Sequence, residues 1–148
     1  MIEAYFDGVC EPRNPGGHAA WGALVKVNGA TVFAKGGYVG FGKMMSNNVA
    51  EYTGFIEAIL QVKCFPGPAL IRGDSKLVIN HLLDEWQVNG GLYLPYYLQA
   101  ANLFRQERER IELEWIPRDQ NEECDRLSKA VLLDRGIKFR IQPQGRVA

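Results

Sequence analysis

Residues 2–17 read Ile-Glu-Ala-Tyr-Phe-Asp-Gly-Val-Cys-Glu-Pro-Arg-Asn-Pro-Gly-Gly, and this stretch decides how the chain begins to fold. Apolar and polar side chains alternate up to Asp7, which is typical of a strand with two different faces. Asp7-Gly8 on its own is also typical of a two-residue hairpin turn. The two prolines and the Gly-Gly pair that follow favour a rigid loop over a paired second strand. We therefore predict a strand that ends at the Asp7 carboxylate, beside a shaped loop over residues 8–17.

Length and charge restrict the class of protein. The chain has 148 residues, with 17 lysines and arginines against 17 aspartates and glutamates, so its formal net charge is zero. This length fits one domain, which we place at 1–136, followed by a tail at 137–148 that is either extended or disordered. Without a global positive field, binding to a polyanion must rely on local patches. Three widely spaced cysteines fit neither a disulfide framework nor a zinc ribbon, and no apolar run approaches the ~20 residues of a membrane helix. We expect a cytoplasmic protein with no membrane span.

Strands and helices alternate through the rest of the sequence. Asn28-Gly29 is a strong hairpin turn between two strands at 19–27 and 30–39. The later elements are a helix capped by Asn47-Asn48, a strand at 69–71 that leads to Asp74, a helix capped by Ser75, a helix at 95–110, a strand at 111–116 and a helix from Asn121 to Gly136. A strand, a helix and a strand form a crossover unit, so the strand before Asp74 should lie parallel to the first. The pattern predicts an α/β fold.

Four carboxylates stand at the ends or starts of these elements: Asp7, Glu51, Asp74 and Asp125. In an open sheet with crossover helices, such positions gather at one edge, where ligands usually bind. Carboxylates brought together there repel each other, and a hard divalent cation such as Mg²⁺ or Mn²⁺ resolves the repulsion. Two such ions can activate water and stabilise the leaving oxygen in hydrolysis of a phosphodiester. Each acid alone also has an ordinary explanation as a turn residue, a helix-dipole partner or part of a cap.

The segments around these acids point to a family. They read Tyr5-Phe6-Asp7-Gly8, Ser46-Asn47-Asn48-Val49-Ala50-Glu51-Tyr52, Arg72-Gly73-Asp74-Ser75-Lys76-Leu77-Val78 and Asn121-Glu122-Glu123-Cys124-Asp125-Arg126-Leu127. In order and spacing this set resembles the type 1 ribonuclease H family over about residues 1–133. The resemblance implies a ribonuclease H-like fold, with a five-stranded mixed sheet of order 3-2-1-4-5 and helices on both faces. It also implies endonucleolytic cleavage of the RNA strand of RNA·DNA hybrids, with the four acids as ligands of two metal ions.

The same resemblance suggests which residues contact the substrate. Three short amides near the acids can hydrogen-bond 2′-hydroxyls or base edges across a shallow minor groove. The backbone from Gly8 to Cys10 is expected against the RNA strand, Ser46 against a phosphate of the DNA strand, and Trp86 against a DNA sugar. The three amides are Asn14, Asn47 and Asn48. Turn or cap duty for the amides, and a core or helix-end position for Trp86, stay open as structural alternatives.

The sequence departs from the family in two places. Many bacterial members carry a flexible histidine before the last helix, whereas residues 117–120 here are Pro-Arg-Asp-Gln. Arg118 stays charged and cannot act as a general base, but it can hold a phosphate. Family members with tight binding often insert a lysine-rich segment after the second helix, and residues 84–94 here contain no lysine or arginine. We therefore expect weak substrate binding with a shallow dependence on salt.

Two functions remain to be compared at this point. The leading one is a metal-dependent ribonuclease for hybrids, acting as a monomer, and double-stranded RNA is a second candidate substrate because it shares an A-like minor groove. The alternative from another class is a non-catalytic module on the same fold that binds hybrids or double-stranded RNA. The presence of all four acids favours the enzyme.

Overall fold

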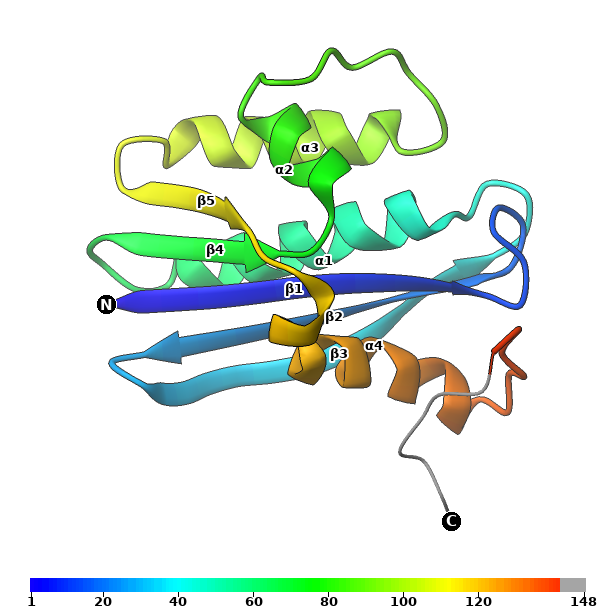
Figure 1. Ribbon diagram of the computed structural model, residues 1–148. Helices are drawn as coiled ribbons and strands as arrows, with labels where there is room; N and C mark the ends of the chain where they lie inside the picture. Colours follow the sequence, from blue (N-terminus) through cyan, green and yellow to red (C-terminus); the bar gives the residue numbers. More distant parts are fainter. Residues whose placement is uncertain (142–148) are drawn as a thin grey trace.

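The computed structural model describes residues 1–141 and shows one mixed sheet covered by helices (Figure 1). The strands are β1 (Ile2–Glu11), β2 (His18–Val27), β3 (Ala30–Phe41), β4 (Ala69–Gly73) and β5 (Ile111–Trp115). The helices are α1 (Asn47–Val62), α2 (Lys76–Leu82), α3 (Leu94–Gln106) and α4 (Glu122–Asp134), with a single 3-10 turn η1 (Arg118–Gln120) before α4.

The sheet has the order β3-β2-β1-β4-β5, which confirms the predicted fold class. β1 lies at its centre, antiparallel to β2 and parallel to β4. The predicted turn between β2 and β3 is also confirmed, because Asn28 and Gly29 both have positive φ angles of 51° and 83°, as such hairpin turns require. The crossover through α1 places the C-terminal end of β4 beside the middle of β1.

The prediction that the first strand ends at Asp7 is wrong. β1 continues to Glu11, and its last residues pair with β2 down to the pair Glu11 and His18. The parallel ladder between β1 and β4, however, stops at Phe6 and Gly73. Asp7 is therefore the first residue of β1 beyond its β4 partner, and only residues 12–17 form the loop. The prolines begin later than the point at which we expected the strand to break, so Gly8 to Glu11 remain free to pair.

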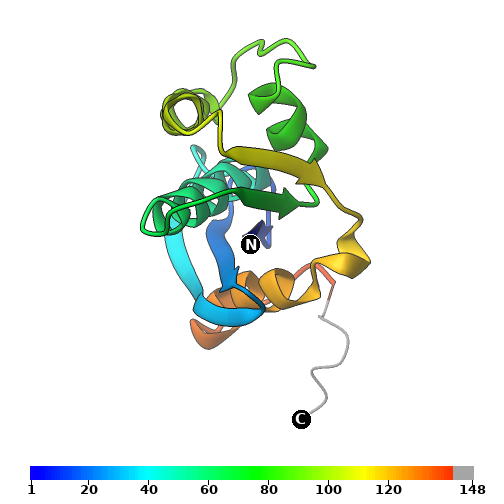
Figure 2. The ribbon, with the colours of Figure 1, turned by 90° about the vertical axis from the view of Figure 1, so that its left-hand side faces the viewer.

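Helices cover both faces of the sheet. Figure 2 shows the sheet from its edge, with α1 and α3 on one side and α4 on the other. The larger core lies under α1, α2 and α3 and includes Phe6, Tyr52 and Phe55 among its fully buried side chains. A smaller apolar cluster under α4 contains Ala20, Leu132 and Phe139.

Some of the observed helix ends differ from the predicted ones. Asn47 and Asn48 do not cap α1, because Ser46 is the N-cap and its Oγ accepts a hydrogen bond from the backbone N–H of Val49 at 3.2 Å. Ser75 caps α2 through Val78 in the same way, as predicted. The third helix ends at Gln106 instead of residue 110, because residues 107–110 form a turn before β5.

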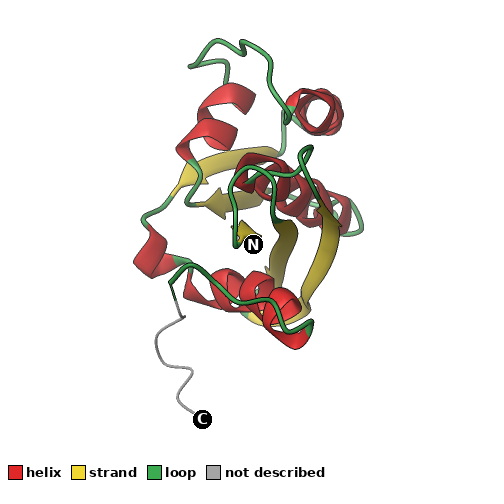
Figure 3. Cartoon of the chain, turned by 90° about the vertical axis from the view of Figure 1, so that its right-hand side faces the viewer, coloured by secondary structure: helices red, strands yellow, loops and turns green. Residues whose placement is uncertain are grey.

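The C-terminal segment continues beyond α4 along the sheet. Figure 3 shows the end of the molecule where β1 turns into β2, with α4 and this segment on one side of the sheet. Phe139 is buried, and Arg140 pairs with Glu11 at 3.0 Å. Phe139 and Arg140 thus anchor the segment to the domain, while the predicted tail from 142 onward lies outside the described residues. None of the helices in residues 1–141 combines the length and apolar character needed to cross a bilayer.

Candidate active site

Three of the four predicted acids converge at the centre of the sheet. Asp7 lies on β1, Glu51 lies on α1, and Asp74 is the residue that directly follows β4. One carboxylate oxygen from each lies within 4.8 Å of the other two. Asp7 and Glu51 are 4% and 8% exposed, so this cluster is shielded from bulk water.

Two glycines bring Glu51 close to Asp7. A Cβ atom on Gly54 of α1 would lie 2.6 Å from the backbone oxygen of Asp7, and one on Gly8 of β1 would collide with the backbone of Ala50 and Glu51. Because both positions lack a side chain, α1 lies directly against β1 at the point where the acids meet. Gly8, expected from the sequence to contact substrate, therefore also has a packing role.

Asp74 is held in place by both neighbours of β4. The backbone N–H of Ile116 donates to the carbonyl of Gly73 at 2.9 Å, and the indole N–H of Trp115 donates to the backbone carbonyl of Asp74 at 3.2 Å. On the other side, Gly73 lies so close to the Phe6 ring that a Cβ atom there would overlap it. The end of β4 is thus fixed against β1.

The cluster is electrostatically unfavourable without a cation. Burial, together with repulsion from the neighbouring acids, raises the pKa of Asp7 and of Glu51 well above the ordinary carboxyl range. Burial also raises the pKa of Asp74, against the nearby Arg118 guanidinium, which lowers it. The backbone N–H of Gly8 donates to Asp7 Oδ1 at 2.8 Å, whereas Glu51 Oε2 is buried with no hydrogen-bond partner. A set of close carboxylates with an unpaired buried oxygen fits a hard divalent cation.

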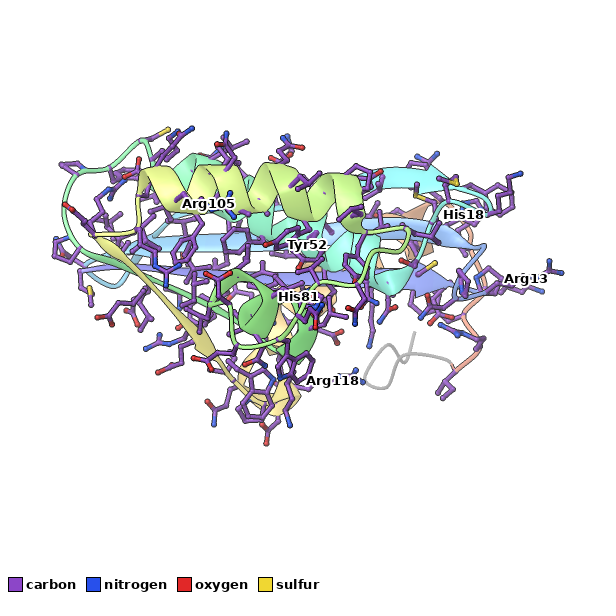
Figure 4. All side chains as sticks on the ribbon, turned by 90° about the horizontal axis from the view of Figure 1, so that it is seen from above. Arg13, His18, Tyr52, His81, Arg105 and Arg118 are labelled. Carbon is purple, nitrogen blue, oxygen red and sulfur yellow. The ribbon has the colours of Figure 1, made fainter. Side chains whose placement is uncertain are left out.

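The fourth acid, Asp125, lies in the first turn of α4 and outside this group of three. It lines the same cleft, and its Oδ2 pairs with Lys129 Nζ at 3.0 Å, one helical turn further on. Arg118 lies on the other side of the acids, with Nε 3.8 Å from Asp74 Oδ2 and a side chain that is 86% exposed. Figure 4 shows Arg118 projecting from the molecule near this point.

A cleft of about 580 Å³ runs from these acids along β1. Its floor is the stretch of β1 from Asp7 to Glu11, and one wall carries the amides of Asn14 and Asn47. The opposite wall, which we call the α4-side wall, consists of Asp125, Lys129, Phe139, Arg140 and Ile141.

The predicted amides lie on the rim opposite α4. Asn14 Oδ1 accepts a hydrogen bond from the backbone N–H of Asn47 at 2.9 Å, and the N–H of Gly16 donates to the carbonyl of Met45 at 2.9 Å. The loop over residues 12–17 is thereby tied to the start of α1. The amide NH₂ of Asn14 has no hydrogen-bond partner within the described residues. Asn47 is exposed and Asn48 is half-buried.

The other residues that were predicted to contact the substrate also have roles in the fold. Ser46 is buried as the cap of α1, although its hydroxyl can still donate one hydrogen bond. Cys10 is buried, and its thiol donates to the carbonyl of Arg13 at 3.0 Å. Trp86 lies beyond α2 and is 47% exposed, with its ring edge-on to His81. His81 itself is buried against Tyr52, with 2.9 Å between Nδ1 and the phenol oxygen (Figure 4), so it packs within the core.

Sequence reasoning missed three residues at this site. Lys129 follows Asp125 at i+4 on α4, a spacing that could have indicated the pair. Arg140 lay in the segment that we expected to be extended or disordered. Asn121, where we expected the last helix to start, is the N-cap of α4, but its side chain makes no capping bond and instead donates from Nδ2 to the backbone carbonyl of Phe6 at 2.8 Å. This bond ties the start of α4 to β1 next to Asp7, and nothing local in the sequence signals it.

Comparisons with known proteins agree with this architecture. A family model described as reverse transcriptase-like matches residues 5–131. The bifunctional protein Rv2228c of Mycobacterium tuberculosis is 39% identical over 117 residues, which cover 78% of this chain and 31% of that protein. Ribonuclease HI of Halobacterium salinarum is 31% identical over 134 residues, which cover 90% of this chain and 65% of that protein. The chain thus spans about a third of the first relative and about two thirds of the second.

Solved structures of the same two relatives have the same fold. The crystal structure of RNase H1 from Halobacterium salinarum matches with a TM-score of 0.78 at 30% identity, covering 90% of this chain and 98% of that one. The N-terminal RNase H domain of Rv2228c matches with a TM-score of 0.76 at 30% identity, covering 92% of this chain and 97% of that one.

Proposed function

Because the chain belongs to the reverse transcriptase-like family, and to the type 1 ribonucleases H that share its fold, we propose that it is a metal-dependent endonuclease that hydrolyses the RNA strand of RNA·DNA hybrids. The observation that carries this proposal is the cluster of Asp7, Glu51 and Asp74 around a buried, unpaired carboxylate oxygen. A relative named ribonuclease HI supports the substrate class.

The metal ligands of the proposal are Asp7, Glu51, Asp74 and Asp125, with two Mg²⁺ ions as the leading cofactor and Mn²⁺ as the other candidate. Bound there, such ions activate water and stabilise the leaving oxygen of the phosphodiester. Asp7 has a central position, because it lies in the cluster and also faces the cleft that Asp125 lines. Glu51 approaches it from α1, which covers one face of the sheet, and Asp74 approaches it from the end of the neighbouring strand β4.

The remaining residues of the cleft bind and orient the substrate. Asn14 and Asn47 present amide groups to the 2′-hydroxyls that distinguish RNA from DNA. Arg118 lies beside Asp74 with most of its guanidinium exposed, which suits contact with the scissile phosphate or the departing one. Because guanidinium does not lose its proton, Arg118 is not a general base.

The alternative raised from the sequence, a non-catalytic module that binds hybrids, has less support. A binding surface has no use for three close carboxylates, two of them buried, that repel both one another and a nucleic-acid backbone. Three expectations from the sequence stay predictions: the use of double-stranded RNA as a second substrate, the monomeric state and the cytoplasmic location.

The decisive experiment incubates labelled RNA·DNA hybrid, double-stranded RNA and double-stranded DNA with the chain and Mg²⁺ or Mn²⁺, alongside Asp7→Asn. We expect cleavage of the RNA strand of the hybrid that leaves 5′-phosphate and 3′-hydroxyl ends and that disappears in Asp7→Asn. If the parent chain leaves the hybrid intact, or if the variant cleaves as fast as the parent, the proposed function is wrong.

A further inference from the structure

The C-terminal segment forms part of the cleft that leads away from the acids. Phe139 packs into the small apolar cluster under α4, which fixes the backbone next to Arg140. The backbone N–H and Nε of Arg140 donate to Glu11 Oε1 at 3.0 and 3.1 Å, and Nη2 donates to Glu11 Oε2 at 3.0 Å. Nη2 also donates to the carbonyl of Cys10 at 2.8 Å. The guanidinium is therefore held against the last residues of β1.

This arrangement leaves Arg140 able to bind a further group. Its side chain is 49% exposed, and within residues 1–141 no partner engages Nη1. A guanidinium has five N–H donors, so two-point contact with Glu11 does not exhaust them. Since the side chain is already ordered, an anion that binds it avoids much of the entropy cost of fixing a free arginine.

Lys129 provides a second cation on the same wall. It projects from α4 one turn after Asp125, and its side chain is 30% exposed. The opposite wall carries the neutral amides of Asn14 and Asn47. The two sides of the cleft therefore differ, with two cationic side chains beside the Asp125 carboxylate on the α4 side and neutral amide groups on the α1 side.

An RNA strand also has two chemically different sides, one with phosphates and one with 2′-hydroxyls. Phosphates are anionic and attract lysine and arginine, whereas 2′-hydroxyls exchange hydrogen bonds with amides. Residues 84–94, after α2, supply no lysine or arginine, so phosphate contacts must come from elsewhere on the molecule. The α4-side wall offers them next to the acids.

We propose that Lys129 and Arg140 bind backbone phosphates of the RNA strand that lie next to the cleaved one, and so orient this strand with its 2′-hydroxyls toward Asn14 and Asn47. This inference rests on the proposed function and extends it. It makes residues 137–141 part of the substrate-binding surface. Arg140 acts here as a binding residue and takes no part in the chemical step.

The test measures the affinity of labelled hybrid across a series of KCl concentrations, with Mg²⁺, in the Asp7→Asn background. We compare Lys129→Gln, Arg140→Gln, the charge-preserving Arg140→Lys, and Arg105→Gln as a control on α3, which Figure 4 shows away from Arg118. Loss of one phosphate contact should reduce the slope of log affinity against log salt by about 0.9. We expect this change for each of the two glutamine variants at 129 and 140, and a retained slope for Arg140→Lys and Arg105→Gln.

A purely structural Arg140, which only anchors the C-terminal segment to Glu11, predicts something else. Its glutamine variant would lose thermal stability but keep the parent salt slope, and that result would overturn the proposal. If Arg140→Gln does not fold, modification of the parent chain by phenylglyoxal, read by mass spectrometry, replaces it. Hybrid should protect Arg140 but not Arg105, and equal modification of Arg140 with and without hybrid contradicts the proposal.

The two proposals fail in different ways. If the parent chain cleaves hybrid while Lys129→Gln and Arg140→Gln keep its salt slope, only the phosphate contacts are wrong. If the parent chain neither cleaves nor binds hybrid, the proposed function itself is wrong, and the phosphate contacts with it.

Discussion

Glu51 is an acid in a position where an isolated carboxylate is costly. It is buried beside Asp7 and Asp74, and one of its oxygens has no hydrogen-bond partner. A buried charge without compensation destabilises a fold, so such a residue persists where a ligand supplies the missing positive charge. At the scale of single residues, the proposed function therefore implies that the site exchanges stability of the metal-free chain for affinity toward a cation.

This exchange predicts how stability depends on pH and metal. Because the folded chain raises the pKa of Asp7, Glu51 and Asp74, it holds more protons than the unfolded chain at pH values above the ordinary carboxyl pKa of 3.8 to 4.5. The contribution of these groups to the free energy of unfolding therefore falls as pH rises from there through the raised pKa values. Thermal unfolding of the metal-free chain should show this fall, and Glu51→Gln should make it smaller.

Glu109→Gln, which removes an exposed carboxylate in the turn between α3 and β5, is the matched control and should leave the fall unchanged. Saturating Mg²⁺ should restore stability at neutral pH, by about 2.7 kcal/mol at a concentration 100 times the Kd. Equal pH dependence in the parent and in Glu51→Gln would contradict this account.

Arg118 gives a second prediction at the residue scale. It lies 3.8 Å from Asp74 and is largely exposed, so removing it should cost little stability. Arg118→Ala should lower kcat more than it raises KM, because a phosphate that develops charge in the transition state interacts more strongly with guanidinium than the ground state does. Steady-state kinetics on hybrid measures both constants, and a rise in KM alone with unchanged kcat would rule out this role.

At the scale of elements, the site depends on how closely α1 approaches β1. The approach requires glycine at position 54 on the helix and at position 8 on the strand. Glycine lowers the intrinsic stability of a helix, by about 1 kcal/mol relative to alanine, so Gly54 would be an improbable choice if α1 only had to be helical. Its reason is packing: it lets Glu51 reach Asp7.

Gly54→Ala should therefore be harmful in spite of the better helix former. The new Cβ atom would lie 2.6 Å from the Asp7 carbonyl, so α1 must shift away from β1. We expect a loss of about 1–3 kcal/mol in the free energy of unfolding, as for other overpacked cores, together with lower turnover. Denaturant unfolding and hybrid cleavage measure the two effects. Gly40→Ala on β3 is the matched control, because its Cβ atom would meet only the Met45 side chain at 3.4 Å, and equal effects of the two substitutions would refute the packing argument.

For the whole molecule, the distribution of charge matters more than its sum. The net charge is zero, yet three cations line the cleft within the described residues: Arg118, Lys129 and Arg140. Each lies near a carboxylate of its own, at 3.8 Å for Arg118 and 3.0 Å for Lys129 and Arg140. The segment after α2, where a second basic surface could have formed, has no lysine or arginine.

This distribution predicts weak, mildly salt-dependent binding. If only the three cleft cations contact phosphates, the slope of log affinity against log salt should be about 3 or less in magnitude. Titration of labelled hybrid into the Asp7→Asn variant at several KCl concentrations gives the slope. A much steeper loss of affinity would mean that basic residues outside the cleft also contact the hybrid.

The sequence by itself determined the order of the elements, the sheet topology and the identity of the acids. Alternation, helical spacing and the Asn28-Gly29 turn are local signals, and the four motifs that surround the acids have a specific order and spacing. Even so, the local rule failed at Asp7, where a strand continued through an Asp-Gly pair because β2 was available to pair with it.

Only the tertiary structure decided how these residues act together. The contact between α1 and β1, the bond from Asn121 to the Phe6 carbonyl, and the pairing of Arg140 with Glu11 each join residues remote in the sequence. The distances among the acids, and the assignment of charge to one wall of the cleft, follow from those contacts. These contacts arise from close packing between elements. Such packing depends on the fit of whole surfaces and leaves no periodic signal in the sequence.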